Sequence, residues 1–414
     1  MSNSTQWQPE MKNTHKILCP QLSPIHFSLI EQVFRDAGFD IDMLSVVSPE
    51  AVELGLRYVN NDMCYPCLLT TGQLLEAIKE YSASPEQTKP LAVIMSQTGG
   101  GCRATNYVSV IRRALDKSGY QHIPIAPFVF GIENSLGLKV RHLKEGLYAI
   151  LLGDVLMTCL HHARPYEKVP GLANDCLDTL IPLVRADLGH MDKASFTGWV
   201  KAITNRFEAV VDWYLPKRPT IGIVGEILLQ YHPNGNEHLP EHIESKGCEA
   251  VVPPFINFLL YCMTGSVFQH EILGRPWINK QAIKWVISYI ENHKAIIQRI
   301  FSGSWHFGSI KWHSIYGLAQ GVDGVVSLAQ SMGEGWLLTA ELIELVKSGT
   351  THNVIAQPFA CLPNKVIGEG VVREIKARYP ESSIISINYD PGASRTNQDN
   401  RLQLLVDELR GVIT

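Results

Sequence analysis

Two short, polar, turn-rich segments hold the cysteines best suited to metal or redox chemistry. The first is NNDMCYPC (60–67), in which Cys64 and Cys67 form a C-x-x-C pair, and the second is SQTGGGCRATNY (96–107), which carries Cys102. Such a pair is compatible with a thioredoxin-like redox site, half of a zinc site or part of an iron–sulfur site. A zinc ribbon needs a second pair of this kind, which the sequence lacks. The redox site, the iron–sulfur site and two thiols without a role all stay open.

A third cysteine has a similar setting. Cys361 lies in QPFACLPNK (357–365), between two prolines that stiffen the segment and remove backbone donors. Thiolates brought together from separate segments favour iron–sulfur clusters or zinc, and three protein ligands leave a fourth position open. Cys19 also stands before a proline near a predicted strand end and is a further candidate ligand. The apolar or helical patterns around the remaining cysteines predict core positions: Cys159, Cys176, Cys248 and Cys262.

The elements around Cys102 predict where its thiol lies. LAVIMS (91–96) is a short apolar run typical of a buried strand, and helical spacing begins at Tyr107. Cys102 is therefore expected at a strand-to-helix turn, on the carboxyl edge of a parallel sheet, where open α/β folds bind ligands. Three consecutive glycines let a bulky group approach the backbone, whose amides favour anions. We expect a cofactor-binding loop made of Gly99, Gly100, Gly101, Gln97 and Asn106.

The order of strand-like and helix-like segments predicts an α/β protein with two Rossmann-like parallel-sheet domains. The first domain is expected over residues 15–136, a helical insert over 137–217, and the second domain over 218–414. The second domain contains TIGIVGEI (220–227), a strand whose end places Glu226 toward the other domain. A metal cluster is expected in a cleft between the two domains, and two halves with a cysteine loop each are compatible with a distant internal duplication.

Composition excludes several classes of protein. The chain has 414 residues, of which 45% are hydrophobic and 18% charged, with a net charge of −4 and no basic run. A nucleic-acid-binding protein dominated by phosphate contacts is therefore not expected. The polar first residues lack the apolar region of a secretory signal, and no apolar run is long enough to span a membrane. Nine scattered cysteines then favour reduced thiols or metal ligands in the cytoplasm.

Together, six motifs resemble one known family: NNDMCYPCLLTTGQ, SQTGGGCRATNY, GIVGEI, GEGW (333–336), QPFACLPN and YDPGAS (389–394). They are similar to the dehydratase-component-like region of the acyl-CoA dehydratase activase-related proteins. That region is related to the subunits of 2-hydroxyacyl-CoA dehydratases and to double-cubane cluster proteins. The resemblance runs from about Lys16 to Leu405, and the combination is far more specific than any single motif.

The resemblance implies an iron–sulfur cluster, either four-iron four-sulfur or a double cubane, with Cys64, Cys102 and Cys361 as ligands. It implies a dehydratase (a lyase) or an ATP-dependent reductase whose low-potential cluster receives electrons from a separate ATP-hydrolysing activator protein. Its substrate would be a small molecule such as an acyl-CoA, with Glu226 and Arg103 in catalytic roles. The chain departs from the family pattern at Cys67, where a small residue is expected, so a fourth thiolate ligand stays open. We also expect a dimer.

Two further functions fit the same residues. One is a non-catalytic scaffold or electron-transfer protein that holds an iron–sulfur cluster or zinc. The second is a thiol redox protein that uses Cys64 and Cys67. An iron–sulfur absorption band would favour the cluster functions over the thiol redox function.

Overall fold

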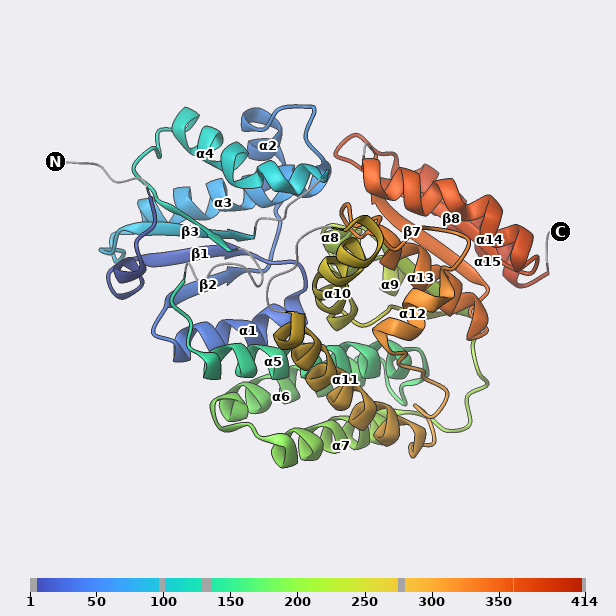
Figure 1. The fold of residues 1–414 in the computed structure, drawn as a ribbon. Coiled ribbons are helices and arrows are strands. Elements are labelled where there is room, and N and C mark those ends of the chain that lie inside the picture. The colour runs from blue at the N-terminus through green and yellow to red at the C-terminus, as the bar shows by residue number, and fades with distance from the viewer. Residues whose placement is uncertain (1–5, 97–100, 129–135, 275–279, 360, 412–414) are drawn as a thin grey trace.

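The computed structural model describes residues 6–96, 101–128, 136–274, 280–359 and 361–411. Within these ranges the chain forms two four-stranded sheets, and every pairing of neighbouring strands is parallel. Figure 1 shows one sheet in the blue and cyan half of the molecule and the other in the orange and red half. The predicted α/β class with parallel sheets is confirmed.

The first sheet has the strand order β2-β1-β3-β4. Its strands are β1 (Lys16–Pro20), β2 (Asp40–Leu44), β3 (Leu91–Ser96) and β4 (Ile125–Phe128). The two inner strands, β1 and β3, are mostly buried, as expected for parallel strands covered on both faces. The helices between the strands are α1 (Pro24–Asp36), α2 (Pro49–Tyr58), α3 (Tyr65–Ala83) and α4 (Tyr107–Lys117), with short 3-10 turns η1 (Pro9–Asn13) and η2 (Arg103–Asn106).

The second sheet has the order β6-β5-β7-β8, which repeats the topology of the first. Its strands are β5 (Thr220–Gly225), β6 (Glu249–Val251), β7 (His352–Pro358) and β8 (Ser383–Tyr389). Its helical elements are α8 (Ile227–Tyr231), α9 (Leu239–Ser245), α10 (Ile256–Leu273), α11 (Lys280–Ser302), α12 (Ile315–Gly321), α13 (Gly335–Lys347), η5 (Asn364–Gly368), η6 (Glu369–Val371), α14 (Val372–Arg378) and α15 (Arg395–Leu409). The shared strand order is compatible with a distant duplication.

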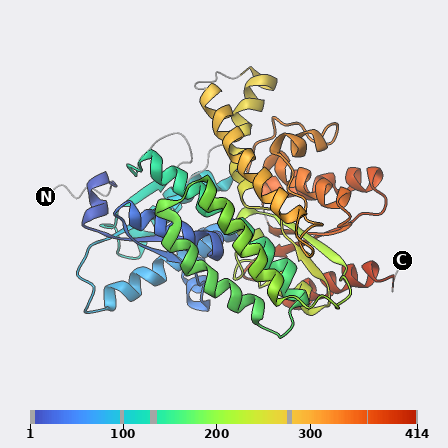
Figure 2. The same cartoon turned by 90° about the horizontal axis from the view of Figure 1, so that it is seen from below.

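A helical layer joins the two halves. It consists of α5 (Val140–Ala163), α6 (Leu172–Asp187) and α7 (Lys193–Val210), with short turns η3 (Arg164–Tyr166) and η4 (Leu188–His190). Helix α5 packs on α1 of the first half and on β6 and α10 of the second. In Figure 2 the green helices of this layer lie between the blue half and the orange half. The relative position of the halves is therefore fixed largely through α5.

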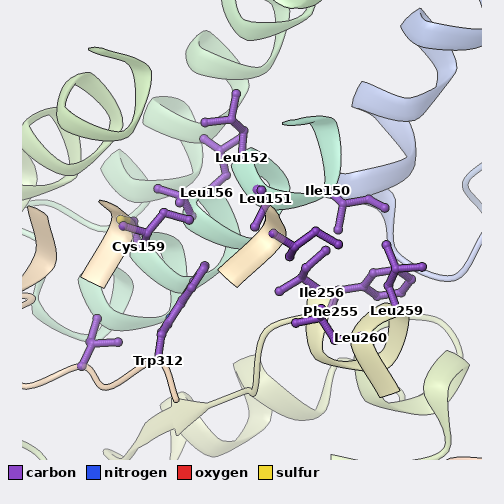
Figure 3. Close-up of a cluster of buried hydrophobic side chains, with 14 of the residues drawn as sticks. Ile150, Leu151, Leu152, Leu156, Cys159, Phe255, Ile256, Leu259, Leu260 and Trp312 are labelled. Carbon is purple, nitrogen blue, oxygen red and sulfur yellow. The ribbon is translucent and has the colours of Figure 1, made fainter. Parts of the chain in front are cut away.

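The main apolar core lies where α5 meets α10. Figure 3 shows Ile150 and Leu151 of α5 on the side toward Ile256 and Leu259 of α10, whereas Leu152 points away from them. All five side chains are buried. Fully burying a side chain of this size contributes about 1.5–3 kcal/mol, so this contact is a major source of stability between the halves.

A buried polar network crosses the same contact. The Ser23 hydroxyl donates to His26 Nδ1 at 2.7 Å, and His26 Nε2 donates to Asp154 Oδ1 at 3.0 Å. The Asp154 carboxylate also accepts from the amides of Phe255 and Ile256, at 2.5 and 3.0 Å. Ser23 and His26 belong to the first half, and the two amides open α10 in the second. Asp154 on α5 thus ties both halves to the helical layer.

Gly153 leaves the room that the His26 ring occupies. A Cβ atom at this position would lie 2.5 Å from His26 Cδ2 and 2.9 Å from Cγ, whereas a Cβ at Gly146 on the same helix would meet nothing within 4 Å. Gly153→Ala should therefore lower the free energy of unfolding by about 1–3 kcal/mol. Gly146→Ala should raise it by about 0.5–1 kcal/mol, since alanine favours the helix. Chemical denaturation of both variants measures this; equal effects would contradict the packing.

One local expectation from the sequence is wrong. The segment around the C-x-x-C pair was expected to be a turn-rich loop, but helix α3 begins at Tyr65 and Cys64 is its N-cap residue. Pro66 stands in the first turn of this helix, where its missing N–H costs nothing. Cys67 is therefore a helical residue. No helix in the described ranges combines the length and apolar character that crossing a bilayer requires.

Candidate metal centre

Cys102 and Cys361 follow equivalent strands of the two sheets. Cys102 comes after β3 and Cys361 after β7, each the third strand of a sheet with the same order. Glu226 follows β5 directly, beside β7. In such sheets the strand order reverses between the first and third strands, and ligands bind outside their carboxyl ends. All three residues thus occupy the positions where this fold class binds ligands.

The cysteine loop of the first half contacts the second half. A Cβ atom on Gly333 would lie 2.9 Å from Pro363 and 4.0 Å from Cys102 Sγ, and a Cβ on Gly101 would run into Met332. The Cys102 sulfur therefore lies beside Gly333 and near the proline of the Cys361 loop. Gly333 has a φ of +57°, and with no side chain it permits this close approach.

Glu334 lies between two glycines with positive φ, Gly333 and Gly335. Its Oε1 accepts from the Ile227 amide at 3.0 Å, and its Oε2 accepts from Asn364 Nδ2 at 2.9 Å. The second contact of Asn364 Nδ2 is the Cys361 sulfur, at 3.2 Å. A continuous chain of hydrogen bonds therefore runs from the start of α8 through Glu334 and Asn364 to the Cys361 thiol.

Glu226 is a second carboxyl group at the start of α8. Its Oε2 accepts from the amides of Leu228 and Leu229, both at 3.0 Å. Burial, together with the neighbouring Glu334, raises the pKa of Glu226 to about 8, and burial also raises the pKa of Glu334. Two carboxylates in such surroundings do not both ionise readily. At neutral pH the pair can therefore hold a proton.

Cys64 lies within the electrostatic reach of these groups. Its thiol is hydrogen-bonded to the Tyr107 hydroxyl at 2.8 Å. Burial raises the pKa of Cys64, Glu226 raises it further, and Arg103 opposes the rise. Arg103 itself is exposed at the start of η2, directly after Cys102. The predicted catalytic residues Arg103 and Glu226 thus both lie within electrostatic range of the Cys64 thiol.

Glu226 and Glu334 also raise the pKa values of Cys102 and Cys361, the other two thiols of the predicted site. Burial raises the pKa of Cys102 to about 12, with further contributions from Glu334, Glu226 and Cys64. Burial also raises the pKa of Cys361, and Glu334 and Glu226 again add to the rise. Cys102 and Cys361 therefore lie within electrostatic range of both carboxyl groups, and Cys64 lies within range of Glu226. Without a cation these sulfurs are thiols; a bound metal would provide the positive charge that thiolates need.

Cys67 is more deeply buried than Cys64. It has no exposed surface and belongs to an apolar cluster with Leu74, Leu75 and Ile78. Burial raises the pKa of its thiol, and Thr71 is its polar neighbour. Cys64 belongs to the same apolar cluster, so a role of Cys67 as a fourth ligand stays a prediction.

The remaining cysteines agree only in part with the core positions predicted for them. Cys19 is buried at the end of β1 and donates weakly to the Pro20 carbonyl at 3.4 Å. Cys159 and Cys248 are buried as predicted, and Cys176 is partly buried. The prediction was wrong for Cys262, whose side chain is exposed on α10. The sequence of α10 is apolar on several sides because the helix packs on several sides, so it did not indicate that Cys262 is exposed.

The candidate ligands suit an iron–sulfur cluster better than a single metal ion. Among the described residues, no group of three or more His, Cys, Asp or Glu side chains lies close enough to hold a single metal ion. A cluster is larger than an ion, so its ligands stand further apart. Two buried polar atoms near Glu334, Tyr261 Oη and Asn364 Oδ1, also have no hydrogen-bond partner within the described part of the chain. Soft sulfur donors from both halves and unpaired polar atoms beside them fit a bound group.

Part of the predicted cofactor loop lies outside the described residues: Gln97, Gly99 and Gly100. Gly101 lies against the Met332 side chain. Asn106 ends η2 with an exposed side chain.

The carboxyl pair makes stability depend on pH. The pKa of Glu226 is raised from 4.5 to about 8, so the folded protein binds a proton that the unfolded chain releases. This contribution to stability is complete below about pH 4.5 and is lost as the pH rises to about 8. In the metal-free protein, the difference in unfolding free energy between wild type and Glu226→Gln should fall by at most about 1.4 kcal/mol per pH unit. Denaturation between pH 5 and pH 8 measures it; a constant difference would contradict the raised pKa.

Sequence reasoning did not find Glu334, Asn364 and Tyr261. GEGW carried a weak signal for Glu334, because an acid between two glycines suits a ligand loop as well as a helix entry. Nothing in the local sequence indicates that Asn364 and Tyr261 lie beside it. Comparison of the chain with protein-family models and with curated proteins found no match to either.

Proposed function

We propose that this chain is an iron–sulfur protein of the 2-hydroxyacyl-CoA dehydratase or ATP-dependent reductase type. Cys64, Cys102 and Cys361 would hold the cluster between the two halves. A separate ATP-hydrolysing activator would supply electrons at low potential, and the substrate would be a small molecule such as an acyl-CoA.

The observation that carries the proposal is that thiols from both halves lie within electrostatic range of shared carboxyl groups: Cys102 and Cys361 of Glu226 and Glu334, and Cys64 of Glu226. Each sulfur also has a hydrogen-bond donor: the Tyr107 hydroxyl for Cys64, the Ala104 amide for Cys102 and the Asn364 amide for Cys361. Hydrogen bonds to sulfur and burial are the means by which proteins set the potential of such clusters.

The protein groups have distinct roles in this proposal. When bound, the cluster would supply one-electron chemistry and an iron that polarises a substrate oxygen. Glu226 and Glu334 hold or release a proton beside that oxygen, because their raised pKa values keep a proton available near neutral pH. Exposed Arg103 attracts an anionic part of the substrate.

A dithiol redox site is the second candidate. Cys64 is the N-cap of α3 and Cys67 lies three residues later, an arrangement that redox pairs use at helix starts. However, Cys67 has no exposed surface, and burial raises the pKa of both thiols, which slows attack by a thiolate.

The visible absorption spectrum of protein reconstituted anaerobically with ferrous iron and sulfide separates the two candidates. The proposal predicts a broad iron–sulfur band that bleaches on reduction and is lost in air. A colourless protein that exchanges disulfides with a small thiol through Cys64 would favour the dithiol site and overturn the cluster.

A further inference from the structure

The side chain of Asn364 contacts a cysteine sulfur and a carboxyl group at the same time. Its side-chain amide donates to Cys361 Sγ at 3.2 Å and to Glu334 Oε2 at 2.9 Å. Its backbone amide also lowers the pKa of the Cys361 thiol, so it lies near the same sulfur. The side-chain and backbone N–H groups of a single residue are thus close to the sulfur.

The surroundings hold this amide in one orientation. Asn364 has no exposed surface and opens the π-helical turn η5 directly after Pro363, whose ring packs near Gly333. Glu334 accepts one hydrogen bond from the Asn364 side chain and another from the Ile227 amide at 3.0 Å. Turns of this kind are rare and often occur at functional sites.

The side-chain N–H groups of Asn364 have hydrogen-bond partners, whereas its side-chain oxygen has none among the described residues. Both hydrogens of the Asn364 side-chain amide have acceptors, whereas its buried Oδ1 has no partner among the described residues. A purely structural asparagine would be expected to satisfy both ends of its amide. The orientation that leaves Oδ1 unpaired is the one that directs N–H groups at the sulfur.

We propose that Asn364 is a positioning residue that raises the reduction potential of the metal centre bound through Cys361. The inference rests on the proposed cluster function. Reduction adds negative charge to the cluster and its sulfurs, and N–H groups directed at a sulfur stabilise that charge. Tyr107 at Cys64 and the Ala104 amide at Cys102 donate one hydrogen bond each, so the largest single effect is expected at Cys361.

The test compares reduction potentials of anaerobically reconstituted variants. Asn364→Leu keeps the approximate size of the side chain and removes its donors, and Asn364→Ser offers a shorter group that cannot reach both acceptors. The matched control is Asn257→Leu, because Asn257 is a buried asparagine that donates to Glu341 at 3.1 Å and accepts from Lys294 at 3.1 Å, in a separate network.

Asn364→Leu should shift the equilibrium of one-electron reduction about tenfold toward the oxidised form, which is about 59 mV to more negative potential. Asn364→Ser should shift it in the same direction by less, and Asn257→Leu should lose stability without a shift. An unchanged potential in Asn364→Leu, or an equal shift in the control, would overturn the inference while leaving the cluster function intact. Loss of iron from both Asn364 variants would instead assign the residue to ligand retention and overturn the claim about potential. A wild-type protein without iron and sulfide would overturn both proposals.

Discussion

Cys361→Ser should lose iron and loosen the contact between the two halves. Serine offers a harder and poorer ligand for this class of metal, and Cys361 is the proposed ligand from the second sheet. Changes to groups that only support a ligand typically cost about 10–100-fold in metal affinity, so loss of the ligand should cost more. Iron content after anaerobic reconstitution and desalting measures the effect, and limited proteolysis reports the looser contact.

Cys248→Ser is the matched control for this variant. Cys248 is fully buried and stands just before β6, at the amino end of the second sheet. The substitution should destabilise the protein by about 1–3 kcal/mol, because it buries a hydroxyl, and should retain iron. A Cys361→Ser protein that kept a full cluster would defeat the site between the halves. Cys64→Ser and Cys102→Ser are expected to behave like Cys361→Ser.

Asp154→Ala should destabilise the protein by about 3–5 kcal/mol. The substitution leaves His26 and the amides of Phe255 and Ile256 without an acceptor at a position with no exposed surface. Because these groups belong to both halves, the loss should also disturb the site between them. Chemical denaturation measures the change in unfolding free energy.

Asp178→Ala on α6 is the control, since Asp178 is exposed and a surface substitution usually changes stability by less than about 0.5 kcal/mol. Similar losses in the two variants would show that Asp154 does not join the halves.

The strand pattern could be predicted because buried parallel strands carry a strong local signal. LAVIMS is an apolar run bounded by turn residues, and it forms β3 with the expected bounds. The start of α3 was missed because a polar segment rich in Asn and Asp precedes it and Pro66 follows Cys64. Proline disfavours a helix interior but suits a first turn, and only the fold distinguishes the two.

The site was predictable where strand ends determine it. Cys102, Cys361 and Glu226 follow strands, and topology places such residues at one edge of a sheet. Glu334 and Asn364 were not predictable, because their importance depends on which loops meet across the two sheets. Cys67 lies in the first turn of α3, within the apolar cluster that also contains Cys64, and its role as a ligand stays a prediction.

The iron and acid-labile sulfide content of protein purified without oxygen decides whether the chain binds an iron–sulfur cluster. We predict at least four iron and about as many sulfide per chain, as a four-iron cluster or a double cubane requires. Both should fall together in Cys64→Ser, Cys102→Ser and Cys361→Ser and persist in Cys248→Ser. Wild-type protein that contains neither iron nor sulfide after anaerobic purification and reconstitution would contradict the account.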